Sequence, residues 1–236
     1  MASTLANSSS VFILCQNKLL FDLKVLNEFS FLYRLKLILL RFYFVLATRN
    51  IDTILVQTLS MQKCIMLSLL SSPNFLRLPR FEESSPLELH SKSSRVYSSP
   101  MSAPLKLFYP ASFLSHKNHS RAFQALNQVY DKLGPLLTLY CTISSQELSS
   151  IYARPGMVVP LGRLSRSEVF DYYQRCDYLF FPSLCESLGL PLLESSSFNL
   201  PVVASDLDYV YESCTPVRTF NPYSVLAITT SLLSLL

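Results

Sequence analysis

From Pro104 onward, short apolar runs alternate with segments of helical periodicity, and this alternation constrains the fold more than any other feature of the chain. The apolar runs LKLFYP, PLLTLYCT, VVPLG, DYLFFPS and PVVASD have the length and composition of buried strands. Residues 116–134, 165–176 and 188–199 predict helices between them, and helical sequence follows Asn221. Strands and helices in this order form a parallel sheet with helices on both faces. The sequence therefore predicts an α/β domain over residues 104–236.

Capping signals mark two of these helices. Ser165 and Glu168 have capping-box spacing, and Gly134 is placed to end the helix before it. The core face predicted for the helix at 116–134 consists of Phe123, Leu126, Tyr130 and Leu133.

The first part of the chain has a different pattern. Residues 11–15 and 52–58 predict buried strands, and residues 33–48 and 60–70 predict helices. Residues 71–103 are rich in Ser and Pro and predict an irregular connection. We therefore expect a small unit with its linker over residues 1–95.

Composition limits the function classes. Half of the 236 residues are apolar and 15% are charged, which is typical of a globular protein. Residues 1–95 carry eleven Lys or Arg and six Asp or Glu, whereas residues 96–236 carry nine and ten. A basic first part is compatible with an anionic membrane surface or substrate, although a solvated surface explains such an excess more often. No pattern predicts nucleic-acid binding.

The six cysteines show no CxxC spacing and no nearby histidine, which excludes the usual zinc spacings and is typical of reduced thiols in a cytosolic protein. The apolar run RLKLILLRFYFVLATR is short and interrupted by Lys36 and Arg41, so it does not predict a membrane span. The opening residues lack the basic region of a secretory signal. We expect a cytoplasmic protein, with peripheral contact at the cytoplasmic membrane face as an open alternative.

The stretch ESLGLPLLE places Glu186 and Glu194 around a glycine where a predicted strand leads into a helix. Loops at the carboxyl ends of parallel strands bind ligands, so Glu186 is expected at the ligand edge of the sheet. The N–H groups near Gly189 and Leu190 would form an anion site at the helix start. From spacing alone, a structural alternative is equally good: Glu186 would cap the helix and Glu194 would lie on the surface.

The segment FFPSLCESLGLPLLESSSFNLPVVASDLDYV closely resembles the hallmark segment of the retaining GT-B glycosyltransferases of group 1, the glycogen synthase and sucrose synthase type. The E-x7-E element of that family corresponds to Glu186 and Glu194, with Gly-Leu-Pro in its expected place. FYPASFLSHKNH resembles the family's first strand and donor loop, with Lys117 at the lysine position. VVPLGRLSRSEVFDYYQRCDYLFFPS resembles the run that precedes the hallmark, so the likeness covers about residues 104–222.

The resemblance implies a GT-B-like fold: a Rossmann-like, nucleotide-sugar-binding domain over 104–236 and a partial acceptor domain before it. It implies that Lys117 and Glu186 are catalytic, with Lys117 neutralising the departing diphosphate and Glu186 lying near the donor sugar. Glu194 would accept hydrogen bonds from the ribose. The other binding positions implied are the N–H groups of Gly189 and Leu190 at the sugar or diphosphate, and the loop of Gly162 and Arg163 at the base.

The implied activity is sugar transfer from a nucleotide-diphosphate sugar to a saccharide or lipid-linked acceptor, with retention at the anomeric carbon. The donor is a co-substrate, and no cofactor or metal is expected, because fixed cations and helix dipoles stabilise the leaving group.

The chain departs from the family pattern near the lysine. Ser112 stands where the family usually has an arginine, and Asn118 stands where glycine is frequent. His116 and His119 flank Lys117, and histidines at a helix start are more often structural or surface residues than catalytic ones.

CQNKLLF resembles a loop of the family's acceptor domain, and NIDTILVQTLSM resembles a strand and turn late in that domain. The resemblance implies that the chain begins midway through the acceptor half and lacks the family's returning C-terminal helix. A two-domain enzyme of this kind needs roughly a hundred residues more. Two alternatives to an enzyme stay open: a degenerate, non-catalytic nucleotide-binding or interaction module, and a membrane-surface structural protein.

Overall fold

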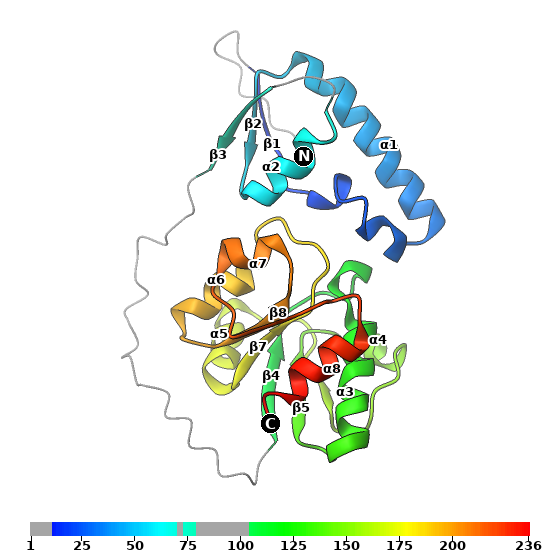
Figure 1. The fold of residues 1–236 in the computed structure, drawn as a ribbon, viewed down its shortest axis with the longest axis vertical. Helices are drawn as coiled ribbons and strands as arrows, with labels where there is room; N and C mark the ends of the chain where they lie inside the picture. The colour runs from blue at the N-terminus through cyan, green and yellow to red at the C-terminus, as the bar shows by residue number, and fades with distance from the viewer. Residues whose placement is uncertain (1–10, 70–72, 79–103) are drawn as a thin grey trace.

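The computed structural model describes residues 11–69, 73–78 and 104–236, which form two parallel sheets (Figure 1). The larger sheet has the order β6-β5-β4-β7-β8-β9, and all of its neighbouring strands are parallel. Its strands are β4 (Leu105–Tyr109), β5 (Leu137–Cys141), β6 (Val158–Pro160), β7 (Tyr178–Phe181), β8 (Val202–Ser205) and β9 (Arg218–Phe220). The strand order therefore reverses between β4 and β7, where doubly wound folds bind their ligands.

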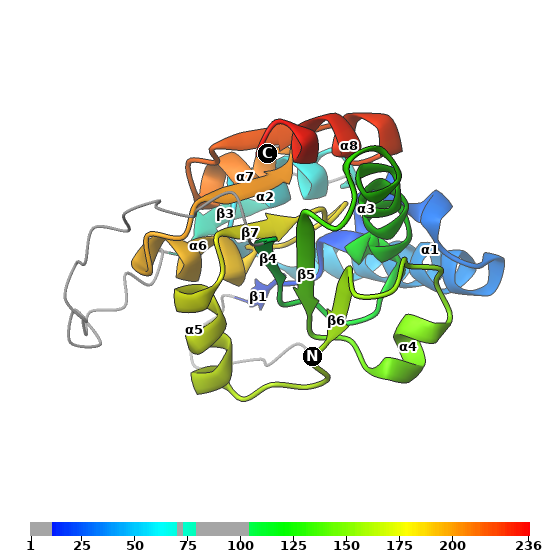
Figure 2. The ribbon, with the colours of Figure 1, turned by 90° about the horizontal axis from the view of Figure 1, so that it is seen from below.

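Helices cover both faces of the larger sheet. They are α3 (His119–Leu133), α4 (Ser145–Ser149), α5 (Arg166–Arg175), α6 (Leu190–Ser197), α7 (Asp208–Ser213) and α8 (Val225–Leu233). Figure 2 shows α3 and α8 on one side of the sheet and α5 and α6 on the other. One continuous apolar core joins these helices to the strands, and β8 is buried along its whole length.

The smaller sheet has the order β1-β2-β3 and is also parallel. Its elements are β1 (Phe12–Leu14), β2 (Thr53–Val56) and β3 (Asn74–Arg77), with the helices α1 (Phe31–Ala47) and α2 (Leu59–Met66) and the 3-10 turns η1 (Lys18–Leu20), η2 (Val25–Glu28) and η3 (Thr48–Asn50). Its own core is small and is built around Ile54, Val56, Met61 and Ile65. We call the described residues 11–78 the N-terminal unit and residues 104–236 the C-terminal unit.

The two units meet at the carboxyl ends of their strands. The Ser187 hydroxyl, in the loop after β7, donates to the carbonyl of Gln16, which follows β1. The Thr58 hydroxyl, after β2, donates to the Ser187 carbonyl at 3.0 Å. At another point the Arg121 guanidinium forms a bidentate pair with Glu28, at 3.0 and 3.1 Å. The ligand edges of both sheets therefore face each other.

Several sequence predictions need correction. Strand β3 lies within the stretch predicted to be irregular, and its apolar content of two residues in four gives little signal. The helix predicted from residue 116 begins at His119, after a 3-10 turn η4 (Ser115–Lys117). Leu133, the last residue of α3, is 49% exposed rather than buried. Elements α4, α7 and β9 were not predicted, and the remainder of the predicted linker, 71–72 and 79–103, lies outside the described residues.

Candidate functional site

The two loops beside the reversal point bring Lys117 and Glu186 together. Lys117 ends the turn η4 in the loop after β4, and Glu186 lies in the loop after β7. The Lys117 Nζ lies 2.5 Å from Glu186 Oε1, and the side chains are only 15% and 13% exposed. A pair this sheltered is held firmly, because removing either partner would leave the other charge poorly solvated.

The backbone at Asn118 fixes the direction of the Lys117 loop. Asn118 has φ 62° and ψ 28°, the left-handed conformation that glycine adopts most easily and asparagine tolerates. Its side-chain amide donates to the carbonyls of Pro182 and Pro222, at 3.1 and 2.8 Å, and its Oδ1 accepts from Arg121 at 3.1 Å. Asn118 thus replaces the frequent glycine and also joins the Lys117 loop to the loop that begins at Pro182.

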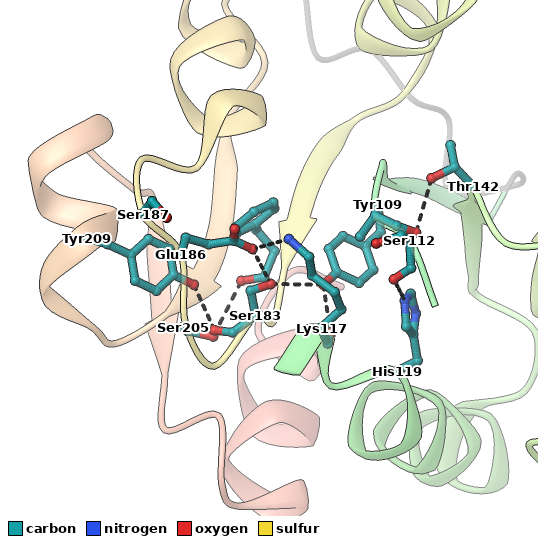
Figure 3. A network of polar contacts seen from close by, with 12 residues as sticks. Tyr109, Ser112, Lys117, His119, Thr142, Ser183, Glu186, Ser187, Ser205 and Tyr209 are labelled. Carbon is teal, nitrogen blue, oxygen red and sulfur yellow. Dashed lines mark hydrogen bonds and ion pairs between the residues drawn. The ribbon is translucent and has the colours of Figure 1, made fainter. Parts of the chain in front are cut away.

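One hydroxyl group donates directly to Glu186, and two tyrosine hydroxyls hold the residues around it, as Figure 3 shows. The Ser183 hydroxyl donates to Glu186 Oε1 at 2.6 Å, and the Tyr209 hydroxyl donates to the Ser183 carbonyl at 2.7 Å. The Tyr109 hydroxyl donates to the Lys117 carbonyl at 2.7 Å and lies 3.3 Å from Ser183 Oγ. Burial raises the pKa of both tyrosines well above the usual value, so both hydroxyls keep their protons. Sequence reasoning missed these residues; only the position of Ser183 and Tyr109 at strand ends signalled them.

Both histidines beside Lys117 are buried. The carbonyl of Ser112 accepts a hydrogen bond from His119 Nε2 at 3.0 Å, which leaves His119 Nδ1 to accept from the Cys141 thiol at 3.8 Å. Burial lowers the pKa of His116 and of His119 to about 4. Both rings are therefore neutral at physiological pH, and His119 has a structural role: it holds the loop in which the exposed Ser112 lies.

Helix α6 begins directly after the Glu186 loop. Gly189 is its N-cap residue, with φ 70°, and a Cβ there would lie 3.0 Å from Leu192 Cδ1. The conformation therefore favours glycine, and a larger residue would also press on the Leu192 side chain. Among the described residues no side chain caps this end, so Glu186 is not the helix cap of the structural alternative. Pro191 has no N–H and the Leu192 N–H donates to the Gly189 carbonyl, so the Leu190 N–H is the donor of this first turn without a side-chain acceptor there.

Glu194 is half-buried one turn further along α6. Its Oε2 accepts a hydrogen bond from the Tyr173 hydroxyl of α5 at 2.9 Å. Burial and the adjacent carboxylate raise the pKa of Tyr173, which stays a donor. Glu194 is thus oriented by a neighbour rather than free on the surface.

Gly162 and Arg163 lie elsewhere on the same edge of the sheet. They follow β6, which is separated from β4 by β5. Gly162 has φ 68°, its N–H donates to the carbonyl of Ile143 at 2.8 Å, and Arg163 is exposed.

The parts of the chain that the structure describes hold neither a metal-binding cluster nor a membrane-spanning helix. No three His, Cys, Asp or Glu side chains there are grouped so that they could hold a metal ion. No helix of residues 11–69, 73–78 or 104–236 is long and apolar enough to cross a bilayer.

Comparison with known proteins identifies the family. The family Glycosyl transferases group 1 matches residues 98–215, which is half of the 236-residue chain. The chain therefore belongs to the group 1 glycosyltransferases, as its sequence predicted. A curated relative, the uncharacterized glycosyltransferase 335 of Sulfolobus islandicus rod-shaped virus 1, is 29% identical over 85 residues, which are 35% of this chain and 25% of that protein.

Solved structures show the same fold. The sucrose-phosphate synthase of Thermosynechococcus elongatus matches with a TM-score of 0.69 and 16% identity, over 95% of this chain and 58% of its own. The UDP-forming α,α-trehalose-phosphate synthase of Burkholderia vietnamiensis matches with a TM-score of 0.62 and 10% identity, over 87% and 58%. The chain thus spans little more than half the length of these proteins. Its α/β architecture is that of GT-B glycosyltransferases, which confirms the predicted fold class.

Proposed function

We propose that the chain transfers a sugar from a nucleotide-diphosphate donor to an acceptor with retention of the anomeric configuration. The observation that carries this proposal is the Lys117–Glu186 pair, which lies on the two loops beside the reversal point of the sheet. A cation and a carboxylate there can serve the two charges of the reaction: the negative diphosphate that leaves and the positive character that develops on the sugar.

The other residues have roles that follow from their positions. The diphosphate would lie between the Lys117 ammonium and the N–H groups of Gly189 and Leu190 at the start of α6. Glu194 would accept from the ribose hydroxyls, since a carboxylate oxygen oriented by Tyr173 still has a free lone pair. Gly162 and Arg163 would border the base. No metal is needed in this arrangement, because the lysine and the helix start supply the positive field.

Donor binding would change the partner of Lys117. Without a donor, its ammonium is neutralised by Glu186. A diphosphate would draw the ammonium away from Glu186, whose carboxylate would then face the sugar while Ser183 still donates to it. The acceptor hydroxyl would attack from the face that the diphosphate leaves, and the departing diphosphate would take its proton.

A second candidate function is nucleotide binding without catalysis. The observation that favours it is Ser112, an exposed serine where the family usually has an arginine, which leaves Lys117 as the cation of this loop. Measurable nucleoside diphosphate binding without transfer to any acceptor would identify this module.

We also infer a peripheral contact with an anionic membrane, which would suit a lipid-linked acceptor. Helix α1 carries Arg34, Lys36 and Arg41 and no acidic residue. Most of its apolar side chains are strongly exposed, and Leu37 is its one buried residue. Leu32, Leu35, Leu39, Phe42 and Leu46, which share one apolar stripe, are 43–77% exposed. An apolar stripe on a helix with only basic charges is typical of an interfacial helix.

The experiment is calorimetric titration of the full chain and three variants with a nucleoside, its diphosphate and its nucleotide sugar. Lys117→Ala should weaken diphosphate binding far more than nucleoside binding. Glu194→Gln should weaken the binding of all three ligands. Hydrogen bonds to charged groups contribute about 1.5–3 kcal/mol, so each loss should approach tenfold or more.

Glu186→Gln should spare diphosphate binding and reduce binding or turnover of the nucleotide sugar. Lys132→Ala, an exposed lysine of α3, is the control and should bind like the parent. If Glu194→Gln binds nucleotide like the parent and only melts at a lower temperature, the carboxylate is structural and the proposed ribose contact is wrong.

A further inference from the structure

The interface between the two units contains a carboxylate that the proposed chemistry does not use. Glu212 of α7 accepts hydrogen bonds from the backbone N–H groups of Leu59 and Ser60, at 2.6 and 2.7 Å, one with each oxygen. These residues form the first turn of α2, whose N–H groups have no partner inside the helix. A carboxylate at this positive end of a helix forms short, charge-assisted bonds.

The same turn of α2 holds the loop that carries Glu186. Thr58 is the N-cap of α2, and its Oγ1 accepts from Met61 N–H while donating to the Ser187 carbonyl at 3.0 Å. Ser187 directly follows Glu186 in the chain. The C-terminal unit therefore binds the start of α2 at two points, and one of them is the neighbour of the proposed catalytic carboxylate.

A buried lysine makes a second connection from this turn to Glu186. Lys18 is only 7% exposed, its Nζ donates to Ser60 Oγ at 3.2 Å, and it lies 5.7 Å from the centre of the Tyr209 ring. Tyr209 in turn holds the Ser183 carbonyl, and the Ser183 hydroxyl donates to Glu186. Lys18 and Ser60 belong to the N-terminal unit and Tyr209 to the C-terminal unit, so the contact between Lys18 and Tyr209 exists only while the two units stay docked.

We propose that Glu212 is a positioning residue for the donor site: by binding the start of α2, it docks the N-terminal unit and thereby orders the 182–189 loop around Glu186. The expected effect of Glu212 on catalysis rests on the proposed function. The docking role of Glu212 does not require a ligand, because its contacts join residues of the free protein.

The test measures how often the loop opens in the full chain without ligand. Cys185 precedes Glu186, is 2% exposed and packs against Val25 of the N-terminal unit, so its thiol reacts with iodoacetamide only when the units separate. Alkylation of Cys185, read by peptide mass spectrometry, should be about tenfold faster in Glu212→Gln, because two charge-assisted bonds are weakened. Cys141, in the core of the C-terminal unit, is the internal reference and should not change.

Two further variants test whether the protection of Cys185 depends on the carboxylate of Glu212 in particular. Glu212→Asp keeps the carboxylate and should restore at least part of the protection of Cys185. Asp131→Asn breaks a charged contact within the C-terminal unit, with Arg154, and should leave Cys185 protected. With a nucleotide sugar, Glu212→Gln should lower turnover while the Kd of the nucleoside diphosphate stays unchanged.

The proposal is overturned if Cys185 reacts at the parental rate in Glu212→Gln, or if Asp131→Asn exposes it equally. An unchanged turnover beside faster alkylation would overturn the link to Glu186. Absence of any nucleotide binding in the parent would instead contradict the proposed function, and the alkylation result would still decide the role of Glu212.

Discussion

At the scale of single residues, the most informative position is Asn118, where a departure from the family pattern is explained by the structure. We expect Asn118→Ala to lower the free energy of unfolding by about 2–4 kcal/mol. This loss combines two effects: alanine in the left-handed conformation costs about 1–2 kcal/mol, and two carbonyls lose the amide that donates to them. Asn118→Gly keeps the backbone conformation and should cost less, about 1–2 kcal/mol.

Urea denaturation of the two variants measures this difference. Asn199→Ala is the control, since exposed Asn199 also has a positive φ of 50° and should report the backbone strain alone. Equal losses in Asn118→Ala and Asn118→Gly would mean that the conformational preference contributes little.

The sequence predicted candidate charged residues for the site but not what they touch. Lys117 and Glu186 stand in recognisable motifs, whereas their contact joins positions 69 residues apart and depends on the strand order. The partners Ser183, Tyr109 and Tyr209 were missed because a tyrosine or serine in an apolar run looks like any other core residue. Hydroxyl networks are tertiary, and no local pattern encodes them.

At the scale of secondary structure elements, α1 is the helix whose exposed apolar side chains favour a binding partner. Leu39→Glu should reduce binding of the full chain to vesicles of mixed neutral and anionic lipid several-fold, because it places a negative charge in the apolar stripe. Vesicle flotation measures the effect, and added salt should weaken parental binding. Leu226→Glu, at a 67% exposed leucine of α8, is the matched control. Parental binding by Leu39→Glu, or none by the parent, would contradict the membrane contact.

Helices and strands were predictable where they are long enough to show a hydrophobic period. The capping box at Ser165 and Glu168 is present, and Gly134 ends α3 with φ 80°, as predicted. The missed elements α4, α7, β3 and β9 are three to six residues long, too short for an apolar period to stand out. Their existence depends on the sheet edge or helix that they pack against.

At the scale of the whole molecule, the two buried histidines make stability depend on pH. Each has a pKa of about 4 when folded, against 6.5 for the free side chain, so the unfolded chain binds more protons between these values. The free energy of unfolding should therefore fall as the pH drops from 6.5 to 4, by up to about 2 kcal/mol per pH unit. His119→Gln, which can still donate to the Ser112 carbonyl, should have a clearly shallower slope. Urea denaturation at several pH values measures both slopes; identical slopes would show that His119 does not contribute.

The meeting of two parallel sheets at their carboxyl ends also determines where the protein can be altered without consequence. The turns that lead into strands lie at the opposite pole of each sheet. In the C-terminal unit these include the turns at Gly134 and Gly156. The two glycines have φ of 80° and 78° and should be kept, whereas their neighbours Lys132 and Pro155 are exposed. A fluorophore or an inserted tag at these turns would stand in open solvent, remote from the loops of Lys117 and Glu186. The common direction of the strands thus gives the protein two ends: one carries the loops of the proposed site, and the other is suited to attaching labels.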